Sequence, residues 1–64
     1  MNNNVKVGDM IRIIDMRGEP EYIGKCGIVE HIDSLGQLHG TWGGLAIIPE
    51  EDVYEVVLYE GNIL

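Results

Sequence analysis

Two histidines and one cysteine, with carboxylates close by, are the residues whose types could do chemistry. His31 and His39 could lie across neighbouring strands, and Cys26, Glu30 or Asp33 could join them. Imidazole, thiolate and carboxylate are the ligands that zinc takes, but zinc motifs pair them as Cys-x-x-Cys or His-x-x-x-His. This spacing is missing here. We therefore predict solvent-facing histidines on strands, with no metal and no cofactor.

Covalent catalysis is the second chemistry to weigh. Cys26 with a histidine could act as nucleophile and base. However, 64 residues leave little room for a desolvated pocket, oxyanion donors and an orienting group. The sequence also has no phosphate-binding glycine motif. We expect a buried or half-buried structural thiol and no enzymatic activity.

The cysteine count and the hydropathy pattern bear on the compartment. A single cysteine cannot form an internal disulfide, which fits a reducing environment. The first residues lack the apolar run of a signal peptide, and no stretch approaches the roughly 20 apolar residues that cross a bilayer. We expect a cytoplasmic protein that does not enter membranes.

Charge constrains the partner. Eleven acidic residues against four basic ones give a net charge of −7, which opposes binding to phosphate backbones. The run Glu50, Glu51 and Asp52 is expected to form a solvated turn that faces a basic or mixed partner. The basic residues all lie in the first 25 positions and could form one modest patch: Lys6, Arg12, Arg17 and Lys25.

Trp42 admits two interpretations. Beside Gly43 and Gly44, its ring could be an accessible platform that forms a partner surface with His39 and Thr41. Alternatively, the ring fills the core. Because the chain has no phenylalanine and only three tyrosines, the core needs this side chain, and we favour burial.

The elements that must position these residues are short strands. Glycines and prolines recur every few residues, so no long helix fits. Asp33 and Gly36 predict a tight hairpin, and broken alternation predicts a bulge near Glu30 or His31. Residues 49–52 predict one helical or 3-10 turn. Runs rich in β-branched and aliphatic residues predict five strands: residues 10–14, 26–32, 37–42, 45–48 and 53–58.

These elements predict an all-β fold, a small five-stranded antiparallel SH3-like barrel with the short 3-10 turn before the last strand. We expect a frayed N-terminus at 1–4, the barrel at 5–58 and an apolar extension at 59–64. The extension adds Tyr59, Ile63 and Leu64 beyond what the barrel needs. These side chains either cap the barrel or contact a second copy in a homodimer, and both remain open.

The order of features resembles a known class. The Val7-Gly8-Asp9 entry to the first strand, the Gly24-Lys25-Cys26-Gly27-Ile28-Val29 step and the run at 32–42 are similar to KOW-type SH3-like barrels. With residues 45–52, the chain resembles a family of short uncharacterised proteins of bacteria, prophages and phages. Gly40 departs from the pattern, because an aliphatic residue is common there. The resemblance implies the fold but supplies no activity.

Three functions follow as hypotheses. The first is a non-catalytic protein-interaction domain, which in a phage or prophage would be an accessory factor that modulates a host protein. The second is a KOW-like module that binds nucleic acid or the ribosome and transcription machinery through the basic patch. The third is an oligomer that binds a nucleotide-like ligand near His39, Thr41 and Trp42. Charge favours the first.

Overall fold

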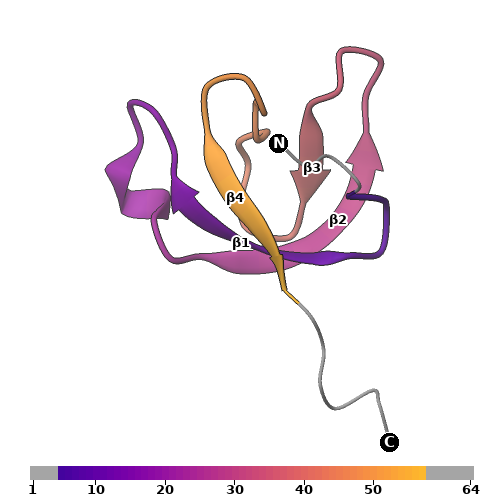
Figure 1. The fold of residues 1–64 in the computed structure, drawn as a ribbon, viewed down its shortest axis with the longest axis horizontal. Coiled ribbons are helices and arrows are strands. Elements are labelled where there is room, and N and C mark those ends of the chain that lie inside the picture. The colour runs from indigo at the N-terminus through magenta and orange to yellow at the C-terminus, as the bar shows by residue number, and fades with distance from the viewer. Residues whose placement is uncertain (1–4, 58–64) are drawn as a thin grey trace, which may run out of the picture.

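The computed structural model describes residues 5–57 and shows an all-β fold (Figure 1). One antiparallel sheet has the strand order β3-β2-β1-β4. A short 3-10 turn, η1 (Pro20–Tyr22), joins the first two strands. The strands are β1 (Met10–Asp15), β2 (Cys26–Ile32), β3 (Leu38–Gly40) and β4 (Val53–Val57).

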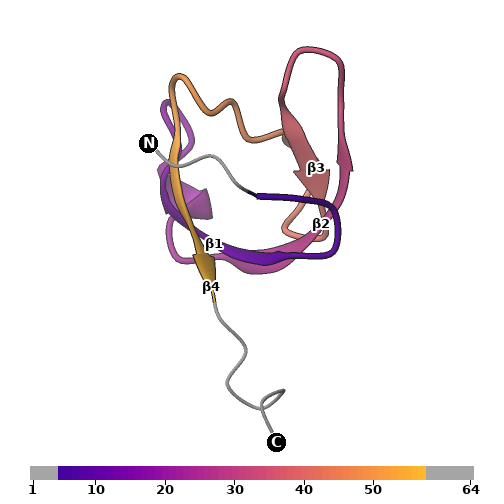
Figure 2. The ribbon, with the colours of Figure 1, turned by 45° about the vertical axis from the view of Figure 1, so that its right-hand side comes forward.

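The sheet curls into an open trough. In Figure 2, β1 and β2 cross its floor, while β4 and β3 rise on opposite sides. Among the described residues, the two edge strands β3 and β4 do not pair with each other. Within residues 5–57 the architecture is therefore an open, four-stranded antiparallel sheet. The predicted all-β antiparallel fold is confirmed, but the sheet does not close into the predicted barrel, and the fifth strand is not confirmed.

Residues 45–48 explain the missing fifth strand. Only Ile47 pairs there, in a single bridge to Leu38. Pro49 cannot donate to a ladder, and the N–H groups of Glu51 and Asp52 both donate to the Ile48 carbonyl (2.8 Å each), which turns the chain. The bond from Glu51 has the i→i+3 spacing of a 3-10 turn and the bond from Asp52 the i→i+4 spacing of a helical turn, so the single turn predicted at residues 49–52 is present. A 3-10 helix also lies at η1, which Pro20 starts.

Alternation of apolar residues along the strands builds the core. Ile11 and Ile13 in β1 point to the concave side and are fully buried, while Arg12 between them is exposed. Other elements add side chains to the same cluster: Met16, Val29, Leu38, Trp42 and Ile47. No helix in residues 5–57 is long and apolar enough to span a membrane.

Trp42 lies in this core with 3% of its surface exposed. Its ring packs so closely on Gly40 that an added Cβ would meet ring atom Cζ3 at 2.4 Å and the Ile28 carbonyl oxygen at 2.2 Å. A Cβ added to Gly27 would likewise meet the Trp42 backbone nitrogen at 2.8 Å. Position 40 therefore has no room for a side chain, because the indole occupies that space.

Two local predictions are confirmed. The register of β2 against β3 shifts between Val29 and His31, where the bulge was expected. In the hairpin, the Asp33 carboxylate accepts N–H groups from Leu35 and Gln37 (2.9 Å each), and Gly36 adopts a φ of +83°. Both follow from sequence-local chemistry. The predictions for residues 1–4 and for Tyr59, Ile63 and Leu64 lie outside the described residues.

Candidate functional site

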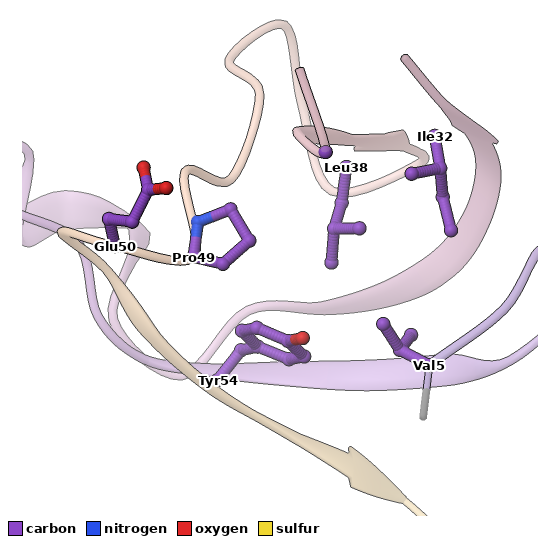
Figure 3. A pocket seen from close by; sticks show the side chains of 7 residues that line it. Val5, Ile32, Leu38, Pro49, Glu50 and Tyr54 are labelled. Carbon is purple, nitrogen blue, oxygen red and sulfur yellow. The ribbon is translucent and has the colours of Figure 1, made fainter. Parts of the chain in front are cut away.

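A pocket of about 490 Å³ lies between the two edge strands (Figure 3). Its lining is mainly apolar, and Glu50 is its one ionisable carboxylate. This volume falls in the range of sites that hold small molecules or the side chains of a partner. The lining residues come from four separate parts of the chain: Val5, Ile32, Gly36, Leu38, Pro49, Glu50 and Tyr54.

Tyr54 forms the β4 side of the pocket. Its register partner in β1 is the buried Ile13, so both side chains lie on the concave face of the sheet. Figure 3 shows the Tyr54 ring reaching across the pocket toward Val5. Burial raises the pKa of the Tyr54 hydroxyl. The hydroxyl is therefore a neutral group that can donate a hydrogen bond at the floor of an apolar site.

The β2–β3 hairpin forms the opposite side, where Ile32 and Leu38 face the pocket. Asp33 holds this hairpin, because its second carboxylate oxygen lies 2.9 Å from Nε2 of His39. The bond to His39, followed by the backbone bond from Gln37, lowers the pKa of Asp33. A charged Asp33 thus fixes the strand ends that carry the two apolar side chains.

The turn before β4 positions Glu50 and Glu51 and uses Asp52 differently. Asp52 is only 8% exposed. Its carboxylate accepts the Arg17 N–H (3.0 Å) and the Ile48 N–H (2.8 Å). The prediction of three solvated carboxylates is therefore wrong for Asp52. Its side chain is buried, and its carboxylate accepts hydrogen bonds that hold the turn. Glu50 and Glu51 remain exposed.

Further acidic residues lie near this turn. Asp52 accepts a hydrogen bond from the loop that leads to η1; Glu19 ends that loop, and Glu21 lies within η1. The Glu19 side chain hydrogen-bonds to Glu21, and this bond, with repulsion between the two carboxylates, raises the pKa of Glu19. Of the carboxylates in this region, only Glu50 lines the pocket, and Glu51 is its exposed neighbour. We call Glu50 and Glu51 the acidic rim, and their charge gives one end of the pocket a negative potential.

The backbone of β4 has one paired side and one outward side. In β1, the Ile13 N–H donates to a carbonyl just before β2 (2.8 Å). Successive residues of a strand direct their backbone groups to opposite sides. The N–H and C=O groups of Arg12 therefore point toward β4, where its register partner is Glu55. Tyr54 and Val56 must then direct their N–H and C=O groups away from β1. These groups form the outward edge of β4.

The outward edge of β3 differs. Leu38 and Ile47 exchange both backbone hydrogen bonds, at 2.9 and 2.8 Å. The Trp42 indole N–H donates to the Leu45 carbonyl (2.8 Å) and holds the same covering segment. Residues 45–47 therefore shield the backbone of β3 beside the pocket.

The predicted partner surface around Trp42 is not assembled. The indole is buried, so the platform hypothesis is wrong; the core needed the ring and Gly40 made room for it. Thr41 uses its hydroxyl oxygen to accept the Ile28 N–H (2.9 Å). His39 is bound to Asp33. Each of these side chains serves the internal structure.

The basic residues have separate surroundings. Arg12 forms an ion pair with Glu55 on the outer face of the sheet, which raises the pKa of Arg12, first through the hydrogen bond. The Lys25 ammonium lies 5.6 Å from the centre of the Tyr22 ring. Lys6 precedes β1, and Arg17 follows it. The candidate cations come from four segments, and Arg12 is already paired with Glu55.

The histidines and the cysteine lie on β2 and β3. The His31 and His39 rings have centroids 5.6 Å apart. Cys26 is exposed at the start of β2, not buried as expected, because its position opposite Arg12 is on the outer face. Within residues 5–57, no group of three or more His, Cys, Asp or Glu side chains could hold a metal ion.

Of the residues that line the pocket, only Glu50 is a candidate binding residue from its sequence pattern. The pocket arises because β3 and β4 fail to meet, and this gap depends on contacts between distant segments. One signal was present: Tyr54 alternates with Glu55 in the last strand, which marks Tyr54 as an inward-facing residue with a polar tip.

Comparisons with protein-family models, with curated proteins and with solved structures found no match for this chain. Function must therefore be inferred from the geometry of the pocket, the acidic rim and the two strand edges.

Proposed function

We propose that this chain is a non-catalytic protein-interaction domain that holds an apolar side chain of its partner in the pocket between β3 and β4. The observation that supports it is the pocket itself, whose walls are the apolar side chains of Ile32, Leu38 and Tyr54. Interface energy concentrates where apolar anchors fill such pockets. A phage or prophage accessory role rests only on the resemblance to short uncharacterised proteins of bacteria, prophages and phages.

Charge supports a basic partner. The chain carries −7 overall, and Glu50 lies in the wall of the pocket beside the rest of the acidic rim. Complementary charge speeds association and excludes partners of the same sign. The partner segment should therefore combine an apolar anchor with lysine or arginine.

The two alternatives have less support. A nucleic-acid module needs free cations, yet Arg12 is paired with Glu55. A nucleotide-like ligand near Trp42 needs an accessible ring, and that ring is 3% exposed.

Selection from a displayed library of random peptides tests the proposal. The immobilised chain should enrich peptides that carry an aliphatic or aromatic residue next to lysine or arginine. Addition of such a peptide should shift the NMR methyl signals of Val5, Ile32 and Leu38. Glu50→Lys should weaken binding by about tenfold, whereas Glu30→Lys, the same charge change at an exposed position of β2 outside the pocket, should not. Enrichment of nothing, or shifts confined to the outer face, would overturn it.

A further inference from the structure

The outward edge of β4 combines exposed apolar side chains with backbone groups that have no partner in β1. Val53 and Val56 are 51% and 42% exposed. Natural edge strands usually discourage pairing with lysine, proline or an inward-pointing charge. Val53–Val57 carries none of these. Its one charged residue, Glu55, is neutralised by Arg12 on the outer face.

This edge also borders the pocket. Tyr54 contributes its side chain to the pocket and its N–H and C=O to the edge. An extended peptide that paired with the edge would direct alternate side chains to the same concave face as Tyr54 and Val56. One of those side chains would then reach the pocket, so pairing and anchoring are geometrically compatible.

We infer that β4 binds the partner as an added antiparallel strand, in which the backbone of an extended, basic segment bonds to Tyr54 and Val56. This inference rests on the proposed function and adds the form and chemistry of the ligand. Strand addition takes its affinity from main-chain hydrogen bonds and its specificity from pockets for alternate side chains. Both parts are present at this edge.

The charge selects another protein rather than a second copy of this chain. A second copy would bring another net charge of −7 to the same edge, and like charges oppose association. A segment with lysine or arginine would instead meet Glu50 and Glu51, which remain exposed just before β4. The occupant is therefore a basic segment with alternating apolar residues.

The antiparallel direction sets the order of residues in the ligand. All three strand pairs of the sheet are antiparallel. The carboxyl end of an added antiparallel strand lies beside the amino end of β4, where Glu50 and Glu51 lie. Apolar residues at alternate positions should therefore precede the basic residues in the ligand.

Two synthetic peptides of identical composition test this order. The probe is acetyl-Thr-Val-Thr-Val-Thr-Lys-Arg-amide, and the control is the reversed peptide, acetyl-Arg-Lys-Thr-Val-Thr-Val-Thr-amide. We expect the probe to bind about tenfold more tightly. Equal or tighter binding of the reversed peptide would overturn the antiparallel direction.

Amide hydrogen exchange of the full chain with the probe tests strand addition itself. The Tyr54 and Val56 amides should become protected on binding, while Glu55, already bonded to β1, should change little. If the peptide shifts Ile32 and Leu38 methyl signals but protects neither amide, the inference fails while the proposed function stands. If no peptide shifts these signals, both fail.

A proline variant removes one edge donor. Val56→Pro lacks the outward N–H and should keep the fold, since edge strands accept proline where the N–H faces out. It should bind the probe at least about tenfold less tightly, because a bond is lost and the ring blocks the edge. Val56→Thr, which keeps the N–H and the branched shape, should bind the probe more tightly than Val56→Pro. Undiminished binding by a folded Val56→Pro variant would overturn the inference, and the exchange experiment decides if that variant does not fold.

Discussion

The outward edges of β3 and β4 border the same pocket but differ in what lies against their backbone. At β3, Ile47 exchanges both hydrogen bonds with Leu38, and Trp42 holds the covering segment through the Leu45 carbonyl. At β4, Tyr54 provides the same kind of backbone groups beside the pocket without a partner in β1. A sheet that shields one edge and presents the other is suited to directional binding of one extended segment.

The largest expected effect is the loss of the Trp42 ring, which fills the core and holds the segment that covers β3. Trp42→Ala should lower the free energy of unfolding by about 3–5 kcal/mol, because a buried indole leaves a cavity and the bond that holds the cover of β3 is lost. Urea unfolding monitored by circular dichroism measures it. Leu45→Ala, at an exposed side chain whose backbone carbonyl is kept, should cost far less. Similar midpoints for Trp42→Ala and the parent would contradict burial.

Loss of the Asp52 carboxylate should destabilise the turn that precedes β4. Asp52→Ala leaves the Arg17 and Ile48 N–H groups without their acceptor, which should cost about 2 kcal/mol. Glu51→Ala, an exposed neighbour in the same turn, is the matched control and should change stability little. Chemical denaturation of both variants compares them. Equal losses would mean that the turn does not depend on the buried carboxylate.

The stability that Asp33 gives the β2–β3 hairpin should depend on pH in the acidic range. Because the pKa of Asp33 is lowered in the folded chain, chiefly by His39, its charged form adds stability above its unfolded pKa of about 3.9. That stability is lost as pH falls through the folded pKa. Asp33→Asn should therefore be less stable than the parent at neutral pH, and the difference should shrink in acid. Urea midpoints across this pH range measure it, and a constant difference would contradict the role of Asp33.

Local chemistry allowed much of the fold to be predicted. Alternation identified Ile11 and Ile13 as inward residues, and Asp33 with Gly36 identified the hairpin, because each signal lies within a few residues. The missing strand could not be predicted in this way. Residues 45–48 have strand-like composition, yet only Ile47 pairs, since the turn after it depends on a contact to distant Arg17.

The candidate site was less predictable for the same reason. A pocket between two edge strands exists only once the whole sheet has curled, and its walls come from segments that share no motif. Trp42 drew attention as an aromatic beside glycines, but those surroundings reflect close packing in the core. Tyr54, the aromatic residue that faces the pocket, follows an exposed valine in an ordinary strand.

Amide hydrogen exchange of the free chain tests the difference between the two edges most directly. The account predicts fast exchange at Tyr54 and Val56, whose N–H groups point outward. It predicts slow exchange at Leu38 and Ile47, each of whose N–H groups donates to the carbonyl of the other residue. Glu55, paired with β1, should be slow and serves as the internal control. Protection of Tyr54 and Val56 in the free chain would show that its own residues or a second copy already cover the edge of β4, and would contradict the account.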